Sequence, residues 1–226
     1  MANKLVFDVI ETLLDLRPVQ ESFARVFGEP GPLGEWFARL LHGSLVATVT
    51  DSYEEFGTIG GRALGAVASR RGHELSDEDR DTILGAMRRL PPHPEVPDAL
   101  ARLRSAGFSL ATLTNSSEQM ARAQLEHAGL VDLFDHVLSV EEVRRYKPAP
   151  EPYLMAADRL RAPPSEMRMV AAHDWDVWGA TRAGCAAAFI ARRDVPFTVG
   201  EPPDLAGPDL SVVAEAILGV DEPSSS

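Results

Sequence analysis

Short apolar segments alternate with amphipathic segments through the second half of the chain, and this alternation limits the fold more than any other feature of the sequence. The expected strands cover residues 108–113, 135–139, 167–172 and 187–191. The expected helices cover residues 95–106, 118–127, 151–160 and a stretch of small residues that ends at Gly184. Strands and helices that alternate at this spacing predict an α/β fold with a doubly wound parallel sheet.

The N-terminal segment 4–15, with the sequence KLVFDVIETLLD, predicts one more strand of this sheet. Its apolar residues 5–7 suit a strand that is buried on both faces, and Asp8 follows where the strand should end. Ligands of open parallel sheets bind beyond the carboxyl ends of the strands, so a carboxylate at this position can act on a ligand. Aspartate is also common in turns and at helix N-caps, and Asp8 taken alone is better explained by that role.

Residues 17–91 have a helical pattern and interrupt the alternation after the first strand. The amphipathic segments are 19–27, 33–47, 52–71 and 77–90. Residues 50–52 are expected to cap the third segment, and the SDED stretch 76–79 to begin the fourth. The proline-rich stretch 91–97 marks the return to strands. We therefore predict two domains, a core of residues 1–16 and 92–226 and a helical insertion of residues 17–91.

Composition narrows the class of partner. At 226 residues and 45% hydrophobic composition, the chain can bury a sizeable core. Its formal net charge of −12 argues against nucleic acid or an anionic membrane surface, since neither is attracted to an acidic protein. The one cysteine, Cys185, provides no disulfide framework and fits a reducing cytoplasm. The sequence shows no signal peptide, and no stretch approaches the roughly 18 apolar residues of a membrane span, so we expect a cytoplasmic protein.

Polar residues follow nearly every predicted core strand. Six of them lie just beyond strands or in the loops that come next: Asp8, Thr12, Thr114, Asn115, Lys147 and Asp176. In a parallel sheet these loops meet at one rim. Solvated loop residues would explain each position singly, but not their recurrence after successive strands. We therefore expect an active site at this rim.

Four motifs carry a resemblance to a known family. In order along the chain they are FDxxxTLLD, LTNSS, KPAPEPY and HDWDxxGAxxAG, with the helical insertion after the first strand. This set resembles the haloacid dehalogenase superfamily, and the resemblance covers nearly the whole chain. It implies a Rossmann-like core, with residues 17–91 as a helical cap domain.

Two positions decide between subfamilies. Most members of the superfamily are magnesium-dependent phosphatases, which have a general acid two residues after the nucleophile, where this chain has Ile10. They also carry a metal-binding acid four residues before the one matched by Asp176, where this chain has Ala172. The remaining carboxylates would give a divalent ion a thin shell of oxygen ligands. We therefore predict that no metal cofactor is needed, and the motifs resemble the metal-independent (S)-2-haloacid dehalogenases.

The resemblance implies a role for each residue of the catalytic set. Asp8 would be the nucleophile, and Thr12 would support the geometry of its carboxylate. Lys147 would hold Asp8 ionised and oriented. Asp176 would position the hydrolytic water or Lys147.

The resemblance also implies a substrate pocket. Thr114 and Asn115 would bind the substrate carboxylate or the backbone near it, and Tyr153 would line the same pocket beside Trp175 of the fourth motif. Arg39 is the best match for the halide-binding arginine of the second cap helix, although it would also suit a solvated helix face. Phe56 matches an apolar pocket residue of the third cap helix, or is plain cap core.

Three residues near this pocket differ from those of the best-known dehalogenases. Ile10 stands where the best-known dehalogenases have a tyrosine, and Ala171 and His173 stand where they have serine and asparagine. His173 either activates water, since imidazole titrates near neutral pH, or is a hydrogen-bonded structural histidine. These substitutions put the substrate range in doubt more than the type of reaction.

The expected function is hydrolytic dehalogenation of short 2-haloalkanoic acids. Attack of Asp8 on C2 would displace halide and form an aspartyl ester, and water would then attack the ester carbonyl, giving a 2-hydroxy acid with inversion. The alternatives are a Mg²⁺-dependent phosphatase that works through an aspartyl phosphate and a non-catalytic protein that keeps the fold. The expected partner is a small haloacid, and homodimers through the cap are common in the resembling family.

Overall fold

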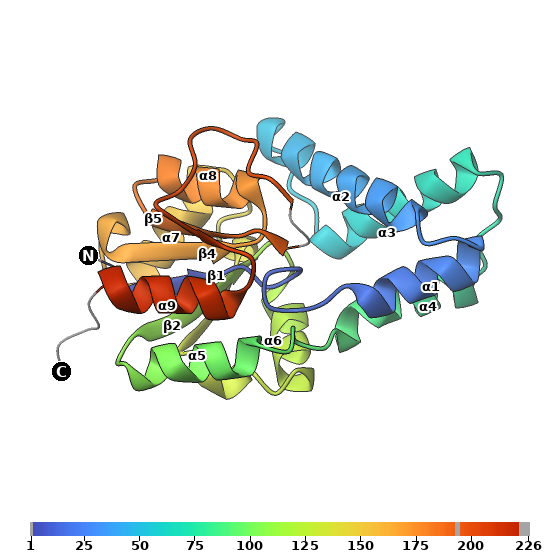
Figure 1. The fold of residues 1–226 in the computed structure, drawn as a ribbon. Coiled ribbons are helices and arrows are strands. Elements are labelled where there is room, and N and C mark those ends of the chain that lie inside the picture. Colours follow the sequence, from blue (N-terminus) through green and yellow to red (C-terminus); the bar gives the residue numbers. More distant parts are fainter. Residues whose placement is uncertain (1, 193–194, 222–226) are drawn as a thin grey trace.

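Six parallel strands form the centre of the molecule in the computed structural model, which describes residues 2–192 and 195–221 (Figure 1). The strands are β1 Lys4–Phe7, β2 Ser109–Thr114, β3 His136–Ser139, β4 Met167–Ala171, β5 Ala186–Ile190 and β6 Leu205–Gly207. They are ordered β3-β2-β1-β4-β5-β6, and each neighbouring pair is parallel. The chain therefore reverses its direction across the sheet between β1 and β4, which is where open α/β sheets bind ligands. The prediction of a doubly wound parallel sheet is confirmed.

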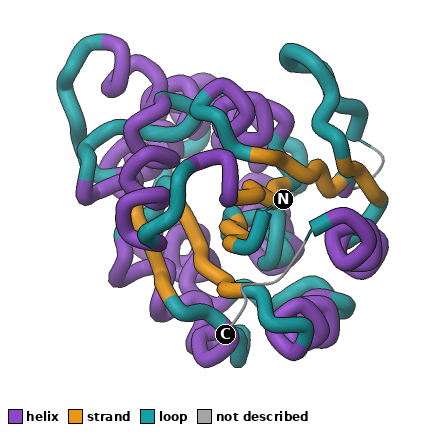
Figure 2. Tube along the Cα trace, turned by 90° about the vertical axis from the view of Figure 1, so that its left-hand side faces the viewer, coloured by secondary structure: helices purple, strands orange, loops and turns teal. Residues whose placement is uncertain are grey.

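Helices cover both faces of the sheet (Figure 2). They are α5 Val96–Ser105, α6 Glu118–His127, α7 Pro150–Leu160, α8 Asp174–Arg182 and α9 Leu210–Val220. Leu5 and Phe7 point to the face covered by α5, α6 and α9, whereas Val6 points to the face covered by α7 and α8. All three side chains are fully buried, which explains why β1 is an uninterrupted apolar run.

The elements between Arg17 and Arg89 are all helical. They are α1 Arg17–Phe27, α2 Pro32–Val49, α3 Phe56–Arg70, α4 Asp77–Ala86 and the 3₁₀ turn η1 Met87–Arg89. These helices extend from the carboxyl ends of the strands, on the right of Figure 1. Trp36 of α2 anchors them, because its indole packs on Phe23 and donates a 2.9 Å hydrogen bond to the carbonyl of Gly60. We propose this helical unit as the cap domain of residues 17–91 and the remainder as the core.

Several element boundaries differ from the sequence predictions. Residues 50–52 do not cap α3, which begins at Phe56 after Glu55. They close the end of α2 instead, because Asp51 has a left-handed backbone (φ 55°) and the Ser52 N–H donates to the carbonyl of Ala47. The predicted start of α4 is confirmed, since Ser76 and Asp79 form a reciprocal capping box.

The C-terminal elements β6 and α9 were not predicted. β6 has three residues and reads LAG, which is too short and too weakly apolar to stand out as a strand. Short 3₁₀ turns also join the main elements: η2 Val131–Leu133, η3 Val140–Glu142 and η4 Pro164–Glu166. No helix in the described part of the chain is both long and apolar enough to span a bilayer.

Candidate active site

Lys147 lies at the centre of the candidate active site, in the loop that precedes α7. Its fully buried ammonium group donates to Asp8 Oδ1 at 2.9 Å, to Asp176 Oδ2 at 2.6 Å and to the carbonyl of Leu113 at 2.8 Å. An ammonium group has three donors, so all of them are used. Asp8 directly follows β1 and Asp176 lies in the first turn of α8, beyond the neighbouring strand β4. The site therefore sits at the point where the strand order reverses.

The ion pairs determine the charge of the site. Burial alone would raise the pKa of Asp8, but the positive charge of Lys147 and the hydrogen bond from His173 outweigh it and lower that pKa far below its ordinary value. Burial would lower the pKa of Lys147, but the charges of Asp176 and Asp8 raise it. Burial and the nearby charge of Asp8 raise the pKa of Asp176 against the opposing effect of Lys147. Asp8 is consequently an ionised carboxylate at neutral pH, facing a charged lysine.

The second oxygen of Asp8 is also held. Asp8 Oδ2 accepts a 2.8 Å hydrogen bond from the Thr12 hydroxyl and lies 3.2 Å from His173 Nδ1. The Thr12 hydroxyl oxygen in turn accepts the N–H of Ala172 at 2.9 Å, which joins the loop after β1 to the loop after β4. Both oxygens of Asp8 thus have fixed partners, so the carboxylate has one orientation.

Tyr153 and Asn115 support the charged centre. The Tyr153 hydroxyl donates to Asp176 Oδ1 at 2.7 Å, and Asn115 Oδ1 accepts the backbone N–H of Lys147 at 3.0 Å. The Thr114 hydroxyl oxygen accepts the Ser116 N–H at 3.1 Å. Tyr153 and Asn115 therefore hold Asp176 and the Lys147 backbone in place, and binding of substrate by these two residues and Thr114 remains a prediction.

Glu11 is a site residue that the sequence did not reveal. Its Oε2 lies 3.1 Å from His173 Nε2, so the imidazole of His173 stands between the carboxylates of Asp8 and Glu11. Burial would lower the pKa of His173, but the hydrogen bonds and charges of the two carboxylates raise it to about 10. His173 is therefore an imidazolium at neutral pH in this state. No local pattern links residues 11 and 173, because they meet only through the pairing of β1 with β4.

Aromatic rings complete the surroundings of His173. The ring of Trp175 stacks on His173 at a centroid distance of 5.1 Å, and the ring of Phe37 from α2 at 5.8 Å. Stacked aromatic rings are favourable neighbours for an imidazolium, which is a delocalised cation. Trp175 therefore lies at the site through His173, its contact with substrate stays a prediction, and Phe37 of α2 reaches the same cluster.

Arg39 lies in α2, the second helix of the proposed cap, and pairs with a neighbour on the same helix. Its Nε donates to Glu35 Oε1 at 3.0 Å, in an i,i+4 pair along α2, and Glu35 also pairs with Arg70 and Arg71 of the α3 end. Residues two apart on a helix are rotated by about 200°, so Phe37 and Arg39 point to opposite sides of α2. Arg39 as the halide-binding residue stays a prediction, and its pair with Glu35 favours the alternative of a helix-surface residue.

Two apolar candidates lie beside the site. Phe56 packs against the ring of Tyr146, the residue before Lys147, at a centroid distance of 5.8 Å. Ile10 is buried in the turn after β1, where it forms a bridge with Leu14. Neither side chain can transfer a proton, so each can contribute only shape and the exclusion of water.

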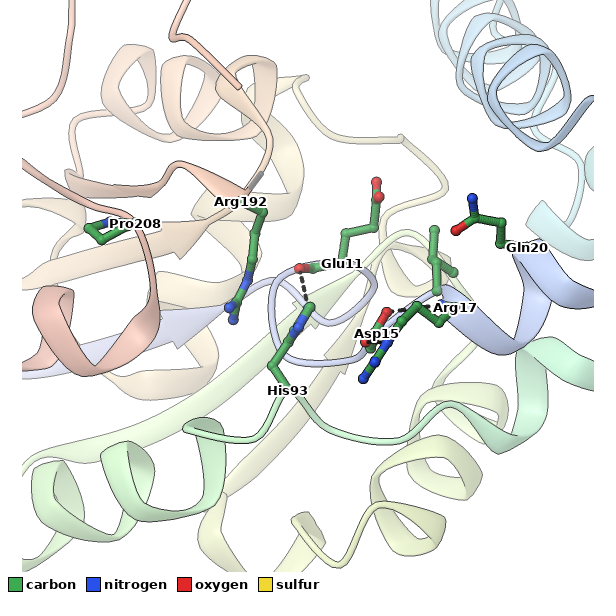
Figure 3. A pocket seen from close by; sticks show the side chains of 8 residues that line it. Glu11, Asp15, Arg17, Gln20, His93, Arg192 and Pro208 are labelled. Atoms are coloured by element: carbon green, nitrogen blue, oxygen red, sulfur yellow. Dashed lines mark hydrogen bonds and ion pairs between the residues drawn. The ribbon is translucent and has the colours of Figure 1, made fainter. Parts of the chain in front are cut away.

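A pocket of about 500 Å³ opens on the far side of the turn after β1 (Figure 3). His93 Nε2 lies 3.1 Å from the carbonyl oxygen of Glu11, whereas the carboxylate of Glu11 points away from His93. Arg192 donates to the carbonyl of Thr12 at 2.7 Å from the same side. Glu11 therefore forms part of the wall between this pocket and the half-buried His173.

The described residues contain no group of three or more His, Cys, Asp or Glu side chains placed to hold a metal ion. Asp8 and Asp176 instead share the ammonium of Lys147, so the positive charge between these two carboxylates belongs to the protein. The prediction of metal independence remains a prediction, and this arrangement supports it.

Comparisons with known proteins point to one family. The family model of haloacid dehalogenase-like hydrolases matches residues 5–184. The chain is 33% identical over 216 residues to an (S)-2-haloacid dehalogenase of Pseudomonas sp. (strain YL), covering 93% of this chain and 92% of that protein. It is 26% identical over 218 residues to haloacetate dehalogenase H-2 of Moraxella sp. (strain B), covering 94% of this chain and 96% of that protein.

The fold agrees with these matches. L-2-haloacid dehalogenase from Xanthobacter autotrophicus superimposes with a TM-score of 0.89 at 26% sequence identity, covering 97% of this chain and all of that chain. A second structure of that enzyme, with chloropropionic acid covalently bound, matches equally well. The chain therefore belongs to the haloacid dehalogenase-like hydrolase family.

Proposed function

We propose that this protein is a hydrolytic dehalogenase of short 2-haloalkanoic acids. The observation that carries the proposal is Asp8, a buried carboxylate kept ionised by Lys147 and oriented through both oxygens at the ligand-binding edge of the sheet. A carboxylate is a weak nucleophile toward carbon, so it needs alignment and removal of its hydration shell. The related dehalogenases lend independent support.

In the first step, an oxygen of Asp8 attacks C2 of the haloacid from the side opposite the halogen. The C–O bond forms as the carbon–halogen bond breaks, so C2 inverts and halide leaves with the bonding electrons. Two cations, Lys147 and His173, contact Asp8 and favour the approach of the substrate anion and the departure of halide.

In the second step, water attacks the ester carbonyl carbon of Asp8. The acyl C–O bond breaks, so the new bond at C2 stays intact and an (S)-2-haloacid gives an (R)-2-hydroxy acid. Asp176 is held by Lys147 and by Tyr153, which supports a role in positioning Lys147 or the water.

Several broader features belong to the same proposal. The centre works without a metal ion, since the Lys147 ammonium already stands between the two carboxylates. Cys185 is buried, and one buried thiol suits a reducing cytoplasm. Homodimerisation through the cap stays a prediction, which sedimentation would test.

The experiment is to measure halide release from chloroacetate, fluoroacetate and the two enantiomers of 2-chloropropionate, each with and without a chelator. Release from (S)-2-chloropropionate with formation of (R)-lactate, unchanged by chelator, is the expected result. Loss of activity with chelator and its return with Mg²⁺, together with cleavage of an aryl phosphate, would identify a phosphatase instead.

A further inference from the structure

We propose that Asp8, His173 and Glu11 form a nucleophile–base–acid triad, in which His173 activates the water that hydrolyses the Asp8 ester and Glu11 orients His173. The inference rests on the proposed dehalogenation and assigns the base of its second step. A triad of this kind is recognised by a nucleophile and a base within hydrogen-bond reach, with the base held by a third group.

The distances match that pattern. His173 Nδ1 lies 3.2 Å from the nucleophile Asp8, and His173 Nε2 lies 3.1 Å from Glu11. Phe37 and Trp175 fix the plane of the imidazole ring. Within residues 2–192 and 195–221, the charged groups found in contact with the ring are Asp8 and Glu11, and its neighbours from α2 and α8 are uncharged aromatics. His173 is thus aimed at the carbonyl that water must attack.

The backbone of Glu11 supports a functional role. Its φ of 63° lies in the left-handed region, which costs a residue with a side chain about 1 kcal/mol or more relative to glycine. The conformation is enforced from both sides, since the Glu11 N–H donates to the carbonyl of Leu14 at 2.9 Å and its own carbonyl contacts His93. Glycine would fit this turn without strain, so Glu11 occupies a position where a side chain is unfavourable.

The first step prepares His173 to act as a base. Before the reaction, two carboxylates favour the protonated form of the imidazole. Ester formation turns Asp8 into a neutral group, so one of the two opposing charges disappears and the pKa of His173 falls. The released proton passes to solvent, which matches the proton produced in the overall reaction. Glu11 offers a path, because its side chain is 28% exposed whereas that of His173 is 12% exposed.

Every proton of the second step can be accounted for. Neutral His173 takes a proton from water as the hydroxide oxygen bonds to the carbonyl carbon of Asp8. When the acyl C–O bond breaks, the alkoxide of the product takes that proton back from His173. The remaining proton on the Asp8 carboxyl group returns to His173, which restores the starting state.

The test is rapid-quench halide release and mass analysis of the Asp8 peptide with (S)-2-chloropropionate. His173→Gln should release about one equivalent of chloride, accumulate the ester, and lose roughly 10²- to 10⁴-fold in steady turnover. His136→Gln, an exposed histidine at the start of β3, is the matched control and should behave like the wild type.

Glu11 is tested through the pH dependence of ester hydrolysis. Glu11→Gln should slow hydrolysis roughly 10²-fold and move the acidic limb of its pH profile to lower pH, because one carboxylate that holds the imidazolium is gone. Glu11→Asp should restore part of the rate. Glu11→Gly keeps the left-handed turn without strain, so this variant stays folded and should also accumulate ester. Arg161→Gly is the control, since Arg161 has a φ of 52° away from the site.

The outcomes separate the two claims. Absence of halide release from the wild type would refute the proposed function. A burst of chloride followed by steady turnover in His173→Gln, without trapped ester, would overturn the triad and leave dehalogenation standing. An unshifted pH profile in folded Glu11→Gln would remove Glu11 from its positioning role.

Discussion

Removal of the Lys147 ammonium tests the charge balance on which the site depends. Lys147→Ala deletes three hydrogen bonds and leaves the carboxylates of Asp8 and Asp176 buried without their shared cation. Asp176 is fully buried and Asp8 is 5% exposed, so solvent can replace little of what is lost. Two carboxylates that shared one ammonium therefore lose it, and the net charge of this group of three side chains becomes more negative by one.

Lys147→Ala should lower the free energy of unfolding, because it removes one partner of a buried ion pair. Such changes destabilise proteins by about 3–5 kcal/mol, because an uncompensated charge stays buried. The pKa values of the two carboxylates should rise in the variant, so one of them takes up a proton as the pH falls. The loss of unfolding free energy should consequently be largest above neutral pH and shrink toward pH 5.

The assay is urea unfolding of the wild type, Lys147→Ala and Lys147→Met between pH 5 and pH 9, with turnover measured in parallel. Turnover of both variants should fall by a large factor, and the acidic limb of the pH–rate profile should move to higher pH. Arg122→Ala, which breaks an exposed pair with Glu118, is the control and should cost less than about 1 kcal/mol. A loss below 1 kcal/mol in Lys147→Ala, with normal turnover, would refute the charge-balance reasoning.

Three further predictions follow from individual contacts. Arg39→Ala should leave kcat/KM within a few fold of wild type, since Arg39 pairs with Glu35, and a drop of 10²-fold would restore it as a halide ligand. Ser76→Ala should lower the unfolding free energy by about 1 kcal/mol through loss of the α4 cap, as measured by urea unfolding. Folding raises the pKa of His173 from 6.5 to about 10, so protonated His173 contributes fully to the unfolding free energy below pH 6.5 and loses that contribution as the pH rises to about 10. A wild-type unfolding free energy that stays flat over this window, as expected for His173→Gln, would contradict the raised pKa.

The sheet and its active edge could be predicted because they depend on local pattern. Buried parallel strands are short apolar runs, and the residues that follow them must meet at one rim. Asp8, Lys147 and Asp176 meet at this rim as predicted, although they lie far apart in sequence. Strand β6 could not be predicted, because three residues are too few to show a periodic pattern.

The finer features of the site could not be predicted for two physical reasons. The direction of a cap side chain changes by about 100° per residue, so an uncertainty of two positions exchanges Phe37 for Arg39 at the site. Glu11 contacts His173 from a left-handed backbone conformation. That conformation usually favours glycine, so a glutamate in the sequence does not indicate such a turn. Both features depend on tertiary geometry.

Transfer of oxygen from water through Asp8 tests the central claim most directly. A single turnover of (S)-2-chloropropionate in ¹⁸O water, with enzyme in excess, separates a nucleophilic Asp8 from one that acts as a general base. If Asp8 forms the ester, water attacks the carbonyl carbon of Asp8, so mass spectrometry should find ¹⁸O in the Asp8 peptide and none in the first lactate formed. Asp8→Asn should give no turnover, because a neutral amide of nearly the same shape is a far poorer nucleophile. Lactate that carries ¹⁸O after the first turnover, with an unlabelled Asp8 peptide, would contradict the account.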